Sequence, residues 1–228
     1  MKQLRVRGIT PIHVGAEELQ RRQARYDAFS PPDITVLLED LPDTQDVPRT
    51  LSSPEDIEAS ERIVAQIALE TDPARFDLIL PDCVLDTGVS RIRAAGAPVP
   101  VVGLSELTAG FVGGLGLRLA AVTRNRPIGE ALDRVISGSG SAASFAGVED
   151  LALSFADISD DVRWNGALEE ARDRIQRSGG ADVILNGCSA VDVTLGDGVP
   201  VFDPTRLALR LLSIALAESM VGARVGAR

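Results

Sequence analysis

The sequence contains only two cysteines and one histidine, too few for a structural zinc site built from these residue types. It also lacks any run of about 18 consecutive apolar residues, the length that a membrane-spanning helix needs. The first residues have no long apolar stretch of the kind found in signal peptides, so a cytoplasmic location is expected. Because a reducing cytosol disfavours disulfides, the thiols of Cys83 and Cys188 are expected to be reduced.

Basic side chains are in the minority. The chain has 33 acidic and 23 basic residues and a formal net charge of −10, which argues against a nucleic acid or an anionic membrane surface as partner. With 228 residues, 45% of them hydrophobic, it can form one large domain or two smaller ones. A small molecule is therefore the expected partner.

Short β-rich runs alternate with helix-length segments along the whole chain, which predicts an α/β fold with helices covering parallel sheets. Eight strands are expected, near residues 4–10, 33–38, 76–80, 99–104, 117–123, 150–155, 182–185 and 199–202. The clearest helices are expected at 53–70, at 161–177 and from 204 onward.

The chain has two glycine-rich stretches, residues 110–116 and 137–141, of which the first invites a phosphate-binding interpretation. The first lacks the lysine and the strand, loop and helix order of a phosphate-binding loop, so it is interpreted as a helix end followed by a turn. The second has the composition of a flexible connection between two elements. Neither is assigned any chemistry.

An internal repeat places the two cysteines at equivalent positions. Residues 77–83 (DLILPDC) align with residues 182–188 (DVILNGC), and residues 99–103 (VPVVG) align with residues 199–203 (VPVFD). A strand, a cysteine and a later strand thus recur together, which predicts a chain built from two similar halves.

Each cysteine ends an apolar strand, and the carboxyl ends of strands are where open α/β sheets bind ligands. A helix start after each thiol is expected to lower the thiol pKa and to favour a thiolate near neutral pH. A single cysteine at a strand end is more often part of the core, but a matched pair favours function. If the halves pack about an approximate two-fold axis, Cys83 and Cys188 can act on opposite faces of one acidic carbon.

These residues resemble the aspartate/glutamate/hydantoin racemase superfamily, and most closely its hydantoin and allantoin racemase branch. Residues 83–89 (CVLDTGV) resemble the C-x-x-D-P-G-L pattern of that branch, in which only the proline is clearly lost. Residues 100–104 (PVVGL), 121–123 (AVT) and 198–204 (GVPVFDP) match further segments in the same order. The similarity spans most of the chain.

The resemblance implies two similar α/β lobes, each with a roughly four-stranded, mainly parallel sheet, related by a pseudo-two-fold axis with the active site between them. The expected lobes are residues 1–102 and 103–203, with the helix at 204–228 packing back on the first lobe. The implied activity is a cofactor-independent racemase with Cys83 and Cys188 as catalytic acid and base. Relatives also imply a homo-oligomer.

The residues that follow the two cysteines indicate which class of substrate the site can bind. Amino-acid racemases of the superfamily place polar Asn-Thr and Thr side chains there, whereas this chain has Val84 and Leu85 after the first cysteine and Ser189 and Ala190 after the second. Poorly matched charges disfavour free aspartate or glutamate. A neutral ring, such as a 5-substituted hydantoin or an allantoin-like compound, is favoured, held by backbone N–H groups that would also stabilise an enolate oxygen.

Other residues at strand ends are weaker candidates. Thr10 and Thr123 are expected to line the site, although residues 10–13 (TPIH) depart from the Asn-Pro-Asn-Thr common in hydantoin racemases. His13 can either tune an acid or base or be structural. Arg124 can either line the opposite wall or be a solvated or ion-paired residue.

Two alternative functions stay open. Relatives on the same scaffold isomerise maleate or decarboxylate malonates with cysteine as nucleophile or sole proton donor, although the presence of both cysteines fits a decarboxylase less well. A non-catalytic protein that binds a metabolite in a two-lobed cleft is the alternative from a different class.

Overall fold

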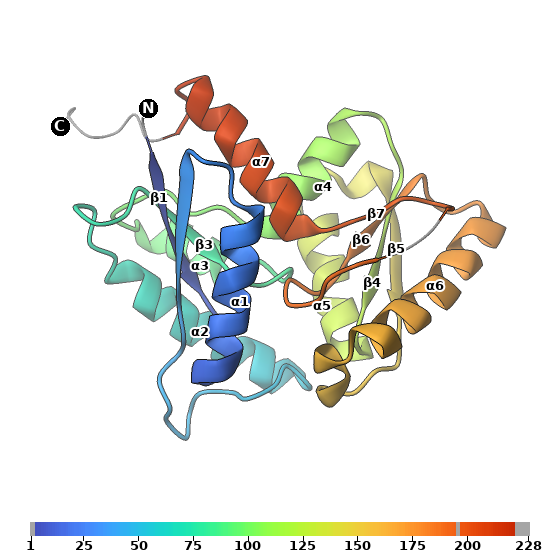
Figure 1. Ribbon diagram of the computed structural model, residues 1–228, viewed down its shortest axis with the longest axis horizontal. Helices are drawn as coiled ribbons and strands as arrows, with labels where there is room; N and C mark the ends of the chain where they lie inside the picture. Colours follow the sequence, from blue (N-terminus) through green and yellow to red (C-terminus); the bar gives the residue numbers. More distant parts are fainter. Residues whose placement is uncertain (1–2, 195–196, 222–228) are drawn as a thin grey trace. The chain divides into compact units, whose positions relative to one another are not determined.

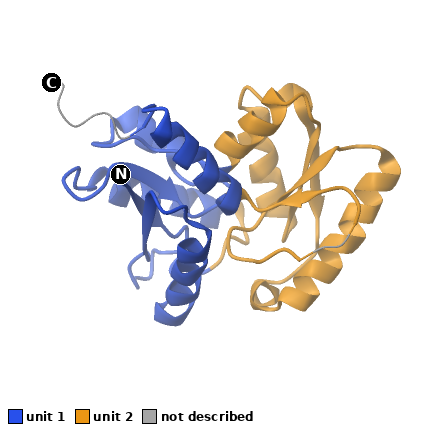
Figure 2. Cartoon of the chain, turned by 45° about the horizontal axis from the view of Figure 1, so that its top comes forward, with its two compact units in different colours: residues 1–49, 55–104, 205–228 blue, residues 50–54, 105–204 orange. Residues whose placement is uncertain are grey.

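The computed structural model describes residues 3–194 and 197–221. The chain divides into two compact units, shown in different colours in Figure 2. Unit 1 takes in the chain as far as Arg49, Glu55–Leu104 and the chain from Thr205 onward, and unit 2 takes in Thr50–Pro54 and Ser105–Pro204. No helix among the described residues combines the length and the apolar character needed to cross a membrane.

Unit 1 contains a parallel sheet of three strands in the order β2-β1-β3 (Figure 1). The strands are β1 (Leu4–Ile9), β2 (Ile34–Glu39) and β3 (Leu78–Pro81). In the central strand, Val6 pairs with Val36 on one side and with Leu78 on the other. Every residue of β3 is buried, as expected for a strand in a parallel sheet that helices cover.

The helices of unit 1 are α1 (Ala16–Phe29), α2 (Pro54–Leu69), α3 (Val89–Ala95) and α7 (Pro204–Ala217). Side chains of α2 and α3, among them Val64 and Ile92, form one hydrophobic cluster with Ile9 and Ile79 of the sheet. The last helix was expected over residues 204–228, but α7 ends at Ala217, and residues 222–228 lie outside the described part of the chain. Helix α7 belongs to unit 1, where the Ser213 hydroxyl lies 2.9 Å from both carboxylate oxygens of Asp33.

Unit 2 contains a parallel sheet of four strands in the order β5-β4-β6-β7. The strands are β4 (Leu119–Thr123), β5 (Phe145–Asp150), β6 (Val183–Asn186) and β7 (Val201–Phe202). The helices are α4 (Leu104–Gly114), α5 (Arg126–Ser137) and α6 (Asp161–Ser178), with short 3-10 turns at Ala142–Ser144 and Ala156–Ser159. Trp164 of α6 is fully buried against this sheet.

The two units share a topology that agrees with the repeat in the sequence. In each, the first strand is central, the second lies on one side, and the third lies on the other side and is followed by a cysteine. A parallel pairing follows in both, Ile79 with Val101 in unit 1 and Ile184 with Val201 in unit 2. The predicted α/β class is confirmed.

Two predicted strands need correction. The strand expected at 99–104 is only a bridge at Val101, so the sheet of unit 1 has three strands rather than about four. Pro98 and Pro100 have no amide hydrogen to donate on either side of Val99, and ladder bonds are limited to Ile79 N–H with Pro100 O and Val102 N–H with Ile79 O.

The strand expected at 150–155 lies earlier, at Phe145–Asp150. The chain turns immediately after this strand, because the Asp150 carboxylate accepts a hydrogen bond from the Ala152 N–H at 2.7 Å and Ala152 has φ 53°. The apolar residues Leu151 and Leu153 are buried in the core although they follow the strand, which explains the misplaced prediction.

Candidate active site

Cys83 lies in the tight loop that leaves the carboxyl end of β3. Its N–H donates to the Pro81 carbonyl at 2.9 Å, and its own carbonyl accepts from the Asp86 N–H at 3.0 Å. The Leu85 N–H donates to the sulfur at 3.4 Å, so one backbone group already serves the thiol. Val84 and Leu85, the predicted neighbours of the substrate, are buried beside it.

Two left-handed residues shape this loop. Asp86 has φ 50° and Gly88 has φ 75°, and Gly88 precedes the first turn of α3. A Cβ on Gly88 would lie 2.9 Å from the Glu61 carbonyl oxygen and 3.2 Å from the Ala65 nitrogen, both in the backbone of α2. Glycine is therefore required at this position for two reasons: the backbone has a positive φ, and α2 leaves no room for a side chain.

Burial raises the pKa of the Cys83 thiol from 9.0 to about 12, with the nearby carboxylates of Asp82 and Asp86 adding to the effect and the Thr87 hydroxyl and Leu85 N–H opposing it. The expectation of a lowered thiol pKa is wrong for Cys83. The following helix, α3, begins only at Val89, so the loss of water around the sulfur outweighs any helix dipole. The raised pKa keeps Cys83 protonated at neutral pH.

A buried network behind Cys83 was not predicted. Asp82 accepts hydrogen bonds from Arg22 and from the Tyr26 hydroxyl, each at 2.9 Å, and both donors come from α1. Burial, and then the Asp82 charge, hold the pKa of Tyr26 well above its ordinary value of 10.0. Arg22 offsets the charge of Asp82, and α1 thereby fixes the backbone next to the thiol.

Cys188 lies in the corresponding loop after β6 and is partly exposed. The buried Asn186 amide donates to the Cys188 carbonyl at 3.0 Å and to the Val191 carbonyl at 3.4 Å. Its oxygen accepts from the Trp164 indole N–H at 3.2 Å. Asn186 therefore holds the cysteine loop against α6. The sequence alone does not reveal this role, because it does not show which residues Asn186 contacts.

Gly187 brings this loop against the neighbouring strand. Its N–H donates to the Val122 carbonyl of β4 at 2.8 Å, and a Cβ at this position would overlap that carbonyl oxygen and lie 2.8 Å from Thr123 Cγ2. Ser189 and Ala190 follow and are buried. Thr123 ends β4, and Ser189 and Ala190 follow Cys188 in the loop after β6, the strand that pairs with β4, so these predicted candidates lie after two neighbouring strands.

Arg124 follows β4 and is 5% exposed. One terminal nitrogen donates to the Leu51 carbonyl at 3.2 Å, and the guanidinium lies over the Phe155 ring, 5.6 Å from its centroid. Burial lowers the pKa of Arg124, while the negative charges of Cys188, Asp150 and Asp157 oppose that change. No carboxylate within the described ranges forms an ion pair with Arg124. Because its side chain is also buried, Arg124 is neither a solvated nor an ion-paired residue.

Thr10 and His13 hold the loops that follow β1 and β2. The fully buried Thr10 hydroxyl lies 2.8 Å from the Ile12 carbonyl and 3.0 Å from the Asp40 carboxylate, and it accepts from the Leu41 N–H. The His13 ring nitrogen Nδ1 lies 2.8 Å from the Leu41 carbonyl and 3.0 Å from Asp40. These contacts favour the structural interpretation of His13.

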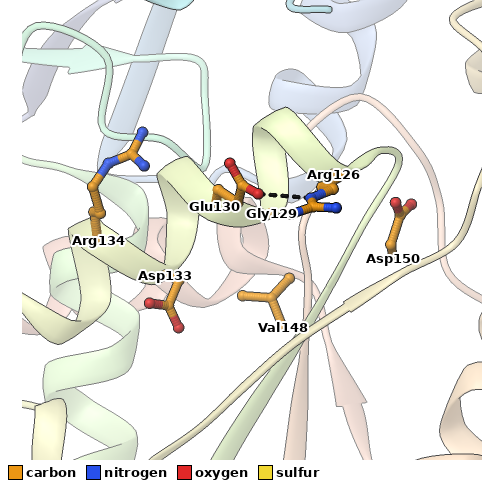
Figure 3. Close-up of a pocket in the computed structure, with 7 residues that line it drawn as sticks. All are labelled: Arg126, Gly129, Glu130, Asp133, Arg134, Val148 and Asp150. Atoms are coloured by element: carbon orange, nitrogen blue, oxygen red, sulfur yellow. Dashed lines mark hydrogen bonds and ion pairs between the residues drawn. The ribbon is translucent and has the colours of Figure 1, made fainter. Parts of the chain in front are cut away.

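A surface cavity of about 410 Å³ lies elsewhere in unit 2, between α5 and β5 (Figure 3). An ion pair at 2.7 Å joins two of its lining residues, Arg126 and Glu130. Its wall carries charges of both signs and includes neither cysteine nor any of the predicted site residues. Among the described residues, no group of His, Cys, Asp and Glu side chains is arranged to hold a metal ion.

Comparison with solved structures finds other proteins with the same fold. The chain superposes on allantoin racemase from Klebsiella pneumoniae with a TM-score of 0.77 and 16% identity, covering 98% of this chain and 92% of the other. Allantoin racemase from Pseudomonas fluorescens gives 0.79 and 18%, covering 95% and 92%. Maleate isomerase from Pseudomonas putida S16 gives 0.59 and 15%, covering 96% and 94%. At these identities the similarity establishes a shared fold.

Sequence comparison identifies the family. Among curated protein sequences none matches the chain significantly. The family model described as Asp/Glu/hydantoin racemase matches residues 14–212, which is most of the chain. The chain therefore belongs to the Asp/Glu/hydantoin racemase family and is an isomerase of the racemase type, as its sequence predicted.

Proposed function

We propose that the chain racemises a cyclic carbon acid, a 5-substituted hydantoin or an allantoin-like compound, with Cys83 and Cys188 as acid and base and with no cofactor. The observation that carries this proposal is the equivalence of the two thiols, each in the loop after the third strand of its own unit. Ligands of α/β sheets bind at this end of the strands. The fold of the two allantoin racemases supports the same substrate class.

The environments of the two thiols suggest different resting states. Cys83 is buried, and its pKa of about 12 keeps it protonated. Cys188 is partly exposed, and its negative charge as a thiolate is the largest of those that raise the pKa of Arg124. In one direction Cys188 is therefore the base and Cys83 the acid.

In that direction, the Cys188 thiolate removes the proton from the acidic carbon, and the electron pair of the C–H bond moves onto the adjacent carbonyl oxygen to form an enolate. Cys83 then donates its S–H proton to the opposite face of the carbon, and the carbonyl forms again. Cys188 is left as the thiol and Cys83 as the thiolate, and proton exchange with solvent resets them. The Leu85 N–H, 3.4 Å from the Cys83 sulfur, stabilises the transient charge there.

The side chains beside the thiols support a ring rather than an amino acid. Val84, Leu85 and Ala190 are buried and apolar, and Ser189 is buried and uncharged. None of them can pair with the carboxylate and the ammonium of a free amino acid at the reacting carbon. A ring with carbonyl and amide groups does not require such pairing.

Polarimetry on single enantiomers of 5-substituted hydantoins and of allantoin tests the proposal, together with incorporation of solvent deuterium at the reacting carbon. We expect Cys83→Ser and Cys188→Ser each to reduce racemisation roughly 100-fold or more. Asp133→Asn, in the surface cavity of unit 2, is the matched control and should retain activity. If both cysteine variants racemise like the wild type, the two-thiol mechanism is wrong.

A further inference from the structure

Arg124 is a buried cation whose hydrogen-bonding capacity is not filled. Its side chain is 5% exposed, one terminal nitrogen donates to the Leu51 carbonyl at 3.2 Å, and its Nε is buried with no hydrogen-bond partner among the described residues. The ring of Phe155 covers the guanidinium at 5.6 Å from its centroid. Its direct contacts are thus a neutral carbonyl and a ring face, and the negative charges of Cys188, Asp150 and Asp157 act on it without an ion pair.

Burying a guanidinium in such surroundings costs free energy unless an anion binds to it. Burial removes the water that would solvate a guanidinium, and neither a carbonyl nor a ring carries a full compensating charge. The Nε–H and an adjacent terminal N–H of arginine form a planar fork that matches the two oxygens of a carboxylate. The unpartnered Nε belongs to that fork.

The position of Arg124 places this charge near a reactive group. Arg124 directly follows β4, which pairs with β6, and the loop after β6 carries Cys188. The Gly187 N–H holds that loop to β4 through the Val122 carbonyl at 2.8 Å. The charge of Cys188 is the largest of those that raise the pKa of Arg124.

We propose that Arg124 binds a carboxylate on the substituent of the substrate ring, so that the preferred substrates are hydantoins with an acidic side chain. This inference rests on the proposed function and adds the class of substituent. It is compatible with the apolar neighbours of the thiols, because the reacting ring stays neutral and only the substituent carries charge.

Two substrates of nearly equal shape test it: 5-(2-carboxyethyl)hydantoin, which is anionic, and 5-(2-carbamoylethyl)hydantoin, which is neutral. We expect the wild type to favour the anionic compound in kcat/KM by roughly 10-fold to 100-fold, the range of a charged hydrogen bond. Arg124→Gln should abolish the preference, and Arg124→Lys should keep part of it. Arg126→Gln, whose side chain is exposed, should leave it unchanged.

An equal or greater kcat/KM for the neutral compound in the wild type overturns the inference, and this comparison needs no variant to fold. Equal losses for both compounds in Arg124→Gln also overturn it, since they would mean that Arg124 serves only the thiolate or the enolate. Calorimetric binding of both compounds to a Cys83→Ser, Cys188→Ser double variant separates the two proposals. Selective binding without racemisation in the wild type would contradict the proposed function alone.

Discussion

The carboxylate of Asp86 packs against the α-carbon of Gly103, so that two motifs that are separate in the sequence meet in unit 1. A Cβ on Gly103 would overlap the Asp86 carboxyl group, with Oδ1 at 2.8 Å. Asp86 itself is held with φ 50° in the loop of Cys83. The glycine of the PVVGL segment is thus the residue that leaves room for the aspartate of the cysteine loop.

Gly103→Ala should therefore destabilise the chain and disturb the Cys83 loop. We expect a loss of about 1–3 kcal/mol in the free energy of unfolding, because Asp86 is buried and its backbone N–H is bonded to the Cys83 carbonyl, so its carboxylate has little freedom to move. Urea unfolding measures it. Gly114→Ala is the matched control, since nothing lies within 4 Å of a Cβ there. Equal stability of the two variants would contradict the packing described.

The buried Cys83 thiol should make stability fall at alkaline pH. Its pKa is raised from 9.0 to about 12, so the folded chain retains the proton while the unfolded chain loses it above pH 9.0. Stability from this group is complete below pH 9.0 and declines by about 1.4 kcal/mol per pH unit up to the folded pKa. In Cys83→Ala the free energy of unfolding should fall less with rising pH, because the variant has no thiol at this position. The free energies of unfolding of both proteins, measured by urea titration between pH 8 and 10, test this prediction. If they fall equally with pH, the prediction is refuted.

The two thiols should differ in their rates of alkylation. Thiolates rather than thiols react, and Cys83 is both buried and held protonated. Cys188 is partly exposed and experiences the charge of Arg124. Iodoacetamide at neutral pH should modify Cys188 at least roughly 10-fold faster than Cys83, as followed by peptide mass spectrometry. In urea the two rates should become similar, and faster labelling of Cys83 in the folded chain would count against the assignment of acid and base.

Tyr26 provides a probe of the network behind Cys83, because it is the one tyrosine of the chain. Burial and the Asp82 charge raise its pKa well above 10.0. Its phenolate absorbance should stay absent as the pH passes 10.0 and should appear only together with unfolding. Ordinary titration near 10.0 in the folded protein would show that the Asp82 bond is not maintained.

Removing the Tyr26 hydroxyl should weaken the same network. Tyr26→Phe leaves Asp82 with one fewer buried donor, which typically costs about 1–3 kcal/mol. Thermal or urea unfolding measures the loss. Gln23→Ala is a suitable comparison, because Gln23 also lies on α1 but bonds to β2 rather than to Asp82. A larger effect of Gln23→Ala would argue against a special role for the tyrosine.

Several helices could not be placed from the sequence, for identifiable reasons. α1 contains buried charges, Arg22 and Arg25, that interrupt any apolar stripe. These charges are tolerated in the folded chain only because Arg22 forms an ion pair with Asp82 and Arg25 lies over the Phe29 ring. α3 is short, with only seven residues, and begins after a turn defined by a left-handed glycine.

The sequence by itself determined the α/β class, the repeat and the position of both cysteines after equivalent strands, because apolar periodicity and local motifs are properties of neighbouring residues. Only the tertiary structure decided that Cys83 is a buried, protonated thiol, that Asn186 clamps the loop of Cys188, and that Arg124 is enclosed without an ion pair. The reason is physical. Burial and hydrogen-bond partners depend on contacts between segments far apart in the chain, and these contacts set the pKa and the charge balance of a site.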